Sequence, residues 1–254
     1  MGHGRVLTGA PEGERVYIIA QPNYPTTARL SSQMKRTLLT LSALFVASVT
    51  SFSVFAQDIK GNAAAGEKKT AMCVGCHGIN GYHSSFPEMH RVPMIAGQSA
   101  KYIAASLTAY KKGERKHPTM RGIADGLSAQ DIADLAAFYA DHGVDFNRGP
   151  LPKPAGGPAQ AMALVTRGGC VSCHGDNFSR PVDPSYPRIA GQHADYLYVA
   201  LKSYKTTDKE QIGRSQPVMA GIAKQFSNEE LKILAEYVGS LPSDLKTVQP
   251  NRFK

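Results

Sequence analysis

The sequence contains no tryptophan and only four cysteines among its 254 residues. Only one stretch, residues 38–55, is apolar over a length that concerns a membrane, so a protein with many membrane spans is excluded. Charged residues make up 19% and hydrophobic residues 42%, which is typical of a globular chain rather than a disordered one. The formal net charge is +9, but the only dense basic run, residues 111–116, is typical of a solvated helix end. We therefore expect no nucleic-acid partner.

The apolar stretch has the flanks of an export signal. Basic residues follow Met34, and a V-F-A cleavage site ends at Ala56. This order predicts a secretory signal peptide at residues 34–56. Residues 1–33 lie upstream of the signal, and we interpret them as an extension that results from a misassigned start. The alternative is that residues 38–55 are retained as a membrane anchor.

The remaining sequence contains an internal repeat. Three blocks occur twice in the same order: C-V-G-C-H-G at 73–78 and C-V-S-C-H-G at 170–175, P-M-I-A-G-Q at 93–98 and P-R-I-A-G-Q at 187–192, and P-T-M-R-G-I-A at 118–124 and P-V-M-A-G-I-A at 217–223. Between the copies, residues 148–158 hold four prolines and three glycines, which is typical of a stiff linker. The repeat predicts two tandem domains, residues 57–147 and 159–254, joined by this linker.

Each copy has the pattern of a helical domain. Apolar and aromatic residues recur at helical spacing over residues 98–112 and 192–205. Ser128 and Ser227 each precede an acidic residue by three positions and a further amphipathic stretch, as N-cap residues do. We also expect a short helix over residues 63–72, leading into the first cysteine. Because no alternating strand pattern of useful length occurs, the expected fold class is all-α.

All four cysteines belong to two C-x-x-C-H motifs, which are the attachment signal of c-type haem. Each thiol can add to a vinyl group of the haem, and the next histidine, His77 or His174, becomes the proximal ligand of the iron. The thioether residues are then Cys73 and Cys76 for one haem, and Cys170 and Cys173 for the other. A redox dithiol would require a strand–helix context that the sequence lacks, and a zinc ribbon would need both cysteine pairs in one place. The sequence therefore predicts two haem c groups.

With these motifs the chain resembles the dihaem cytochrome c4 family, over about residues 58–242. The resemblance implies two tandem class I cytochrome c domains, each wrapped around one covalently attached haem. It implies an electron carrier of the bacterial periplasm, sometimes loosely held at the membrane surface. It also implies a set of iron ligands and supporting carbonyl groups: His77 with Met120, His174 with Met219, and the carbonyls of Pro93 and Pro187 as acceptors of the histidine Nδ1–H.

The residues themselves also favour Met120 and Met219 as the distal ligands. They lie 43 and 45 residues after the proximal histidines, and each follows a proline by two positions. We expect the proline to keep the chain extended there and to present the thioether to the iron. Met94 and His117 are rivals in the first copy, but the second copy has arginine and glutamine at those positions. Met120 is therefore the expected distal ligand of the first iron.

Histidine and methionine on opposite sides leave the iron with no vacant position, which suits an electron carrier rather than an enzyme. We expect the protein to transfer electrons from a quinol–cytochrome c reductase to a terminal oxidase, with a mild positive charge steering the docking. Two alternatives remain. The chain could be a membrane-anchored cytochrome subunit of a respiratory complex, held by residues 38–55, or a dihaem peroxidase-type enzyme.

Overall fold

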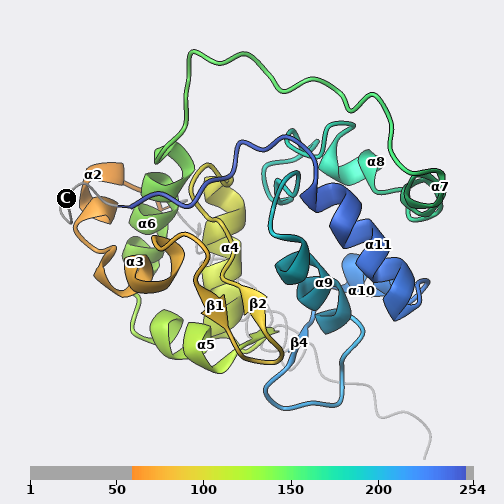
Figure 1. Cartoon of the computed structure of the whole chain (residues 1–254). Helices are drawn as coiled ribbons and strands as arrows, with labels where there is room; N and C mark the ends of the chain where they lie inside the picture. Colours follow the sequence, from red (N-terminus) through yellow and green to blue (C-terminus); the bar gives the residue numbers. More distant parts are fainter. Residues whose placement is uncertain (1–58, 250–254) are drawn as a thin grey trace, which may run out of the picture. The chain divides into compact units, whose positions relative to one another are not determined.

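The structure, a computed structural model, describes residues 59–249 (Figure 1). The predicted signal peptide at residues 34–56 and the upstream residues 1–33 lie outside the described residues. The described residues belong to one compact unit, Gln57–Lys254. None of the helices in residues 59–249 is both long and apolar enough to cross a membrane.

Helices dominate both halves of the described chain. The first half contains α2 (Ala63–Glu67), α3 (Ala71–His77), α4 (Ala100–Lys111), α5 (Pro118–Asp125) and α6 (Ala129–Asp141). The second half contains α7 (Ala159–Arg167), α8 (Val171–His174), α9 (Ala194–Ser203), α10 (Pro217–Ala223) and α11 (Asn228–Gly239). The sequence repeat is therefore present in the fold, because α3 to α6 recur in the same order as α8 to α11.

Two short antiparallel strand pairs complete the described fold. β1 (His83–Ser84) pairs with β2 (His90–Arg91) within the first half. β3 (Arg115–Lys116) pairs with β4 (Gly213–Arg214) and so joins the two halves. Strands of two residues are too short to produce an alternating pattern in the sequence, which explains why none was expected.

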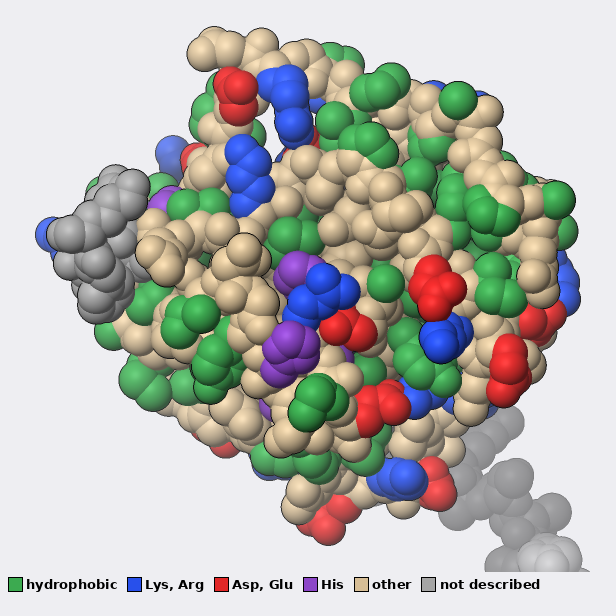
Figure 2. Space-filling model, viewed as in Figure 1, with side chains coloured by type: hydrophobic (Ala, Val, Ile, Leu, Met, Phe, Trp, Pro, Cys, Tyr) green, Lys and Arg blue, Asp and Glu red, His purple; other side chains and the backbone are tan. Residues whose placement is uncertain are grey.

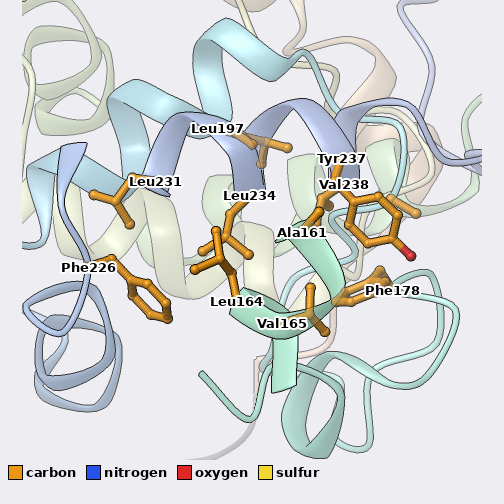
Figure 3. Packing of buried hydrophobic residues seen from close by; sticks show 12 residues of the cluster. Ala161, Leu164, Val165, Phe178, Leu197, Phe226, Leu231, Leu234, Tyr237 and Val238 are labelled. Carbon is orange, nitrogen blue, oxygen red and sulfur yellow. The ribbon is translucent and has the colours of Figure 1, made fainter. Parts of the chain in front are cut away.

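Each half buries a hydrophobic core of its own. In the second half, α7, α9 and α11 contribute Leu164, Leu197 and Leu234, which point toward one another in Figure 3. In the first half, Ile103 of α4 packs with Leu135 of α6. Because each core stays within one copy of the repeat, we call α2 to α6 the first domain and α7 to α11 the second domain.

Both N-cap predictions are confirmed. Oγ of Ser128 accepts a hydrogen bond from the N–H of Asp131 at 3.1 Å, and Oγ of Ser227 accepts one from the N–H of Glu230 at 3.2 Å. In each case the acidic side chain accepts the serine N–H in return, which completes a capping box. The helices expected after the two I-A-G-Q blocks are also present, as α4 and α9.

The single helix expected over residues 63–72 is wrong, because α2 and α3 are separate helices joined by a turn. Gly66 lies so close to α6 that a Cβ there would be 2.1 Å from the carbonyl oxygen of Asp134. The turn then brings Nζ of Lys69 within 2.6 Å of a carboxylate oxygen of both Asp131 and Asp134. Contacts with α6 therefore override the local helical pattern.

Lys69→Met is expected to lower the free energy of unfolding. It should also make this free energy depend less on pH in the acid range. Lys69 is the main cause of the lowered pKa of Asp131 and Asp134. Carboxylates with a lowered pKa stabilise the fold above the ordinary value of about 4, and this stabilisation is lost as the pH falls. Urea unfolding at pH 7 and at pH 3 measures both effects.

The exposed neighbour Lys68 provides a matched control for this experiment. Lys68→Met should change the free energy of unfolding by no more than about 0.5 kcal/mol. A Lys69→Met protein that kept the stability and the acid dependence of the unchanged protein would show that the ion pairs with α6 do not hold the turn.

Candidate functional site

The two C-x-x-C-H motifs lie on or beside the short helices α3 and α8. Three-residue spacing places the two thiols of each motif about one helical turn apart, on the same side. All four cysteines are free of disulfide bonds. Burial raises the pKa of Cys73 and of Cys170, the first cysteine of each pair. A redox dithiol needs a lowered thiol pKa, so the structure argues against that alternative.

The histidine of each motif is oriented by a backbone carbonyl. Nδ1 of His77 lies 2.8 Å from the carbonyl oxygen of Pro93, and Nδ1 of His174 lies 3.0 Å from that of Pro187. Because a carbonyl oxygen only accepts, each Nδ1 carries the proton and leaves the lone pair of Nε2 free. Burial lowers the pKa of both histidines, so both rings are neutral at pH 7. A neutral ring with a free Nε2 is the form that binds a metal.

Met120 and Met219 lie in helices, so the extended conformation expected for them is wrong. Pro118 and Pro217 occupy the first turns of α5 and α10, and each methionine follows in the same turn. A proline restricts the residue before it, whereas its own φ suits the first position of a helix. The prolines therefore start short helices that hold the methionines.

His117 and Gln216 cap these two helices. Nδ1 of His117 accepts a hydrogen bond from the N–H of Met120 at 3.4 Å, and Oε1 of Gln216 accepts one from the N–H of Met219 at 2.6 Å. Both capping residues have an extended backbone, as a residue before proline should. The two positions share one role, so the presence of His117 is explained without any bond to a metal.

His117→Ala is expected to destabilise α5 without removing an iron ligand. Loss of an N-cap acceptor typically costs about 0.5–2 kcal/mol, and urea unfolding of the complete protein measures it. Gln216→Ala should have a similar effect through α10. The near-infrared absorption of the oxidised protein, which reports sulfur bound to iron, should be unchanged in both variants. Loss of this absorption in His117→Ala but not in Gln216→Ala would contradict the capping role of His117.

The repeated P-x-I-A-G-Q blocks join the two domains through what we call the glutamine seam: Gln98, Gln192 and the backbones of Met94 and Arg188. Oε1 of Gln192 accepts the Met94 N–H at 3.1 Å, and its Nε2 donates to the Met94 carbonyl at 2.9 Å. Gln98 makes the matching two bonds with Arg188, both at 2.9 Å. Both glutamines are buried.

The glutamine seam explains why a methionine in one copy aligns with an arginine in the other. The seam bonds of Met94 and Arg188 use only their backbone, so the seam itself does not require the same side chain in both copies. The Arg188 side chain adds a bond of its own, because its Nη1 donates to the carbonyl of Gly97 at 2.7 Å. Sequence analysis missed this role. The available signal was a repeated glutamine that neither the helical pattern nor the haem motif requires.

One cavity of about 930 Å³ contacts every predicted site residue. Those residues are Cys73, Cys76, His77, Pro93, Met120, Cys170, Cys173, His174, Pro187 and Met219. Much of the remaining wall is apolar and includes Ile123, Leu135 and Leu234. Ligand pockets in proteins usually measure about 300–1,000 Å³, so this cavity is large enough for a bulky apolar group.

Two arginines lie where the domains meet. Arg115 and Arg214 are paired across β3 and β4, and both line the cavity. The Nη2 atoms of both donate to the hydroxyl of Tyr196, at 2.7 Å from Arg115 and 3.2 Å from Arg214. Burial alone would raise the pKa of Tyr196, but the two guanidinium charges lower it to about 8. This part of the cavity wall is therefore strongly positive.

These arginines have no acidic partner in the part of the chain that the structure describes. Within residues 59–249, neither forms an ion pair with a carboxylate. In the same range Nε of Arg115 is buried and lacks a hydrogen-bond partner. Adjacent cations in a partly buried site are costly unless an anion joins them. A haem has two propionate carboxylates and a large apolar ring, so the thiols, the neutral histidines, the apolar wall and the unpaired guanidinium all fit it.

Comparison with known proteins agrees with this fit. The cytochrome c family matches the chain twice, at residues 63–141 and 158–242. Cytochrome c4 of Azotobacter vinelandii is 31% identical over 203 residues, which cover 71% of this chain and 90% of that protein. The thiosulfate dehydrogenase electron acceptor of Thiomonas intermedia is 28% identical, and the match covers 82% of this chain and 92% of that protein.

The fold has a counterpart among solved structures. The crystal structure of reduced recombinant cytochrome c4 from Pseudomonas stutzeri gives a TM-score of 0.53 at 29% identity, covering 72% of this chain and all of that one. This likeness and the double family match confirm the predicted all-α tandem of two cytochrome c domains. The chain therefore belongs to the cytochrome c4 family and is a dihaem electron-transfer cytochrome with two covalently bound haem c groups.

Proposed function

We propose that this cytochrome transfers electrons in the periplasm, from a quinol–cytochrome c reductase to a terminal oxidase. The main support is that the starts of α5 and α10, with Met120 and Met219, line the same cavity as His77 and His174. One imidazole and one thioether for each iron leave no position for oxygen or peroxide. Such a site suits a carrier and does not suit a peroxidase.

In this proposal each domain holds its own haem through a complete set of side chains: Cys73, Cys76, His77 and Met120 in the first, and Cys170, Cys173, His174 and Met219 in the second. Bound haem supplies an iron that takes up and releases one electron. The protein keeps the ligands in place. The carbonyls of Pro93 and Pro187 fix the histidine rings through Nδ1. The N-caps hold the turns that bear the methionines.

Carbon monoxide tests the proposed absence of a vacant iron position. The gas binds ferrous haem only where a position is open. We expect the absorption spectrum of the fully reduced protein to stay unchanged when carbon monoxide is added at neutral pH. Rapid binding at one or both haems would favour the dihaem peroxidase-type alternative over the carrier.

The protein has a positive formal charge that should steer its docking. This charge is +9 over all 254 residues, a value that includes the proposed signal peptide. On the face seen in Figure 2, basic and acidic side chains are interspersed rather than gathered into one patch. Steering of an acidic redox partner should therefore be modest and should weaken as salt is added.

Export is proposed from the signal pattern at residues 34–56. Sequencing the N-terminus of the protein isolated from cells distinguishes the two alternatives. A start at Gln57 supports a cleaved signal and a carrier that leaves the membrane. A chain that retains residues 38–55 supports the anchored subunit of a respiratory complex.

The relative from Thiomonas intermedia provides a second candidate donor, because its name describes an electron acceptor of thiosulfate dehydrogenase. Mixing the oxidised cytochrome with each reduced donor, and following haem reduction, decides between them. Faster reduction by the quinol–cytochrome c reductase supports the first proposal. Faster reduction by a thiosulfate-oxidising enzyme supports the second.

A further inference from the structure

The last described residues leave the second domain and return to the first. After α11, the dark blue segment in Figure 1 runs across to the first domain and ends near α2. We call residues 243–249 the strap. The second match to the cytochrome c family ends at residue 242, so the strap lies beyond the part of the chain that the family describes.

Where the chain leads into the strap, it passes close to two glycines, one in each of the repeated I-A-G-Q blocks. Both Gly191 and Gly97 have a positive φ, of 64° and 79°. A Cβ on Gly191 would lie 2.6 Å from the carbonyl oxygen of Leu241, and one on Gly97 would lie 2.5 Å from that of Asp244. The segment therefore passes over one turn of each domain, with no room for a side chain beneath it.

The strap is fixed to the first domain by its backbone and its apolar side chains. The N–H of Lys246 donates to the carbonyl of Ala96 at 3.0 Å, in an isolated antiparallel bridge. Leu245 is buried, and Val248 packs on the core of the first domain. A Cβ at Gly143, which follows α6, would lie 2.6 Å from Cγ2 of Val248.

An ion pair adds to these contacts. The guanidinium of Arg148, where the linker begins, pairs with the carboxylate of Asp244 and also donates to the carbonyl of Ser243 at 3.4 Å. The linker itself cannot fix the domains, because most of residues 148–158 are exposed. Figure 1 shows it as a long arch between α6 and α7. Direct contacts between the domains must therefore set their arrangement.

We propose that the strap is a positioning element that holds the two domains, and with them the two haems, in one relative arrangement. It acts beside the glutamine seam, on Ala96, Gly97 and Gly191 of the same I-A-G-Q blocks. Transfer of an electron depends steeply on the separation of the two sites. The rate of electron exchange between the haems should therefore depend on the strap. This inference rests on the proposed placement of one haem in each domain.

The bridge to Ala96 offers a matched pair of variants. Lys246→Pro removes the N–H that bonds to Ala96, whereas Lys246→Ala keeps it and removes only an exposed side chain. In half-reduced protein, NMR exchange spectroscopy measures the exchange rate between the haems. We expect the rate in Lys246→Pro to be several-fold lower than in Lys246→Ala. Equal rates in the two variants would overturn the proposal.

Truncation gives an independent test on the whole strap. A chain that stops after Pro242 lacks the strap, and a chain that stops after Gln249 keeps it. The shorter chain should show slower exchange and two separate urea unfolding transitions, and the longer chain should behave as the full protein does. If the two chains exchange and unfold alike, the strap has no positioning role. Haem content and near-infrared absorption, measured on the same samples, report separately on the proposed haem sites.

Discussion

Met120→Ala is expected to remove half of the near-infrared absorption that reports sulfur bound to iron in the oxidised protein. Each of two irons should contribute equally to this absorption, and the variant removes one of two thioethers. The position that opens on the first iron should then bind carbon monoxide in the reduced state. Met219→Ala should give the same two results for the second iron.

Met94→Leu is the matched control for Met120→Ala. The bonds that Met94 makes in the glutamine seam use its backbone, so a leucine should keep them. Both the near-infrared absorption and the resistance to carbon monoxide should be unchanged. If Met94→Leu removes the absorption and Met120→Ala does not, Met94 is the ligand and the alignment of the repeats is misleading at this position.

Arg115→Gln is expected to lower the midpoint potential of at least one haem. A nearby positive charge favours the reduced haem, which carries one positive charge less than the oxidised haem. At an effective dielectric constant of about 20, a unit charge about 10 Å away contributes about 1.7 kcal/mol. For a one-electron couple, a change of about 59 mV in the potential changes the ratio of oxidised to reduced haem tenfold. If a spectroelectrochemical titration shows the midpoint potential falling by roughly this amount, Arg115 is identified as a partner of the haem propionates.

Two controls separate this charge effect from a structural one. Arg115→Lys keeps the charge and should keep most of the potential. Lys112→Gln removes an exposed charge from the same domain and should leave both potentials nearly unchanged. Arg214→Gln should also lower a potential, because Arg214 faces the same cavity. Potentials that are the same in Arg115→Gln and Lys112→Gln would contradict the proposed role of the arginine pair.

The features that the sequence predicted correctly are local or repeated. A C-x-x-C-H motif needs only five residues, and its recurrence in a second copy removes most alternatives. The capping boxes at Ser128 and Ser227 are also complete within four residues. Their hydrogen bonds close within a single turn, so no distant contact can displace them.

The errors arose where a local rule was applied to the wrong residue or was overridden from a distance. The proline rule made the chain extended at His117 and Gln216, one position before each proline, and not at the methionines. The helix expected over residues 63–72 was interrupted because Lys69 reaches two carboxylates of α6. Neither outcome can be seen from periodicity alone.

The contacts between the domains could not be predicted from the pattern at all. The glutamine seam joins residues that are 98 and 90 positions apart in the chain. Arg115 meets Arg214 only through a strand pair of two residues. Nothing in the sequence near Lys246 indicates that it returns to Ala96. Such contacts depend on how two finished domains pack, which a single sequence does not reveal.

Mass spectrometry of the intact protein tests the central claim most directly. If each C-x-x-C-H motif holds one haem, the exported chain should have the mass of residues 57–254 plus two haems, with no free thiol. Proteolytic peptides that contain residues 73–77 and 170–174 should each carry one haem. A protein with one haem or none, made in cells with working haem-attachment machinery, would contradict the account.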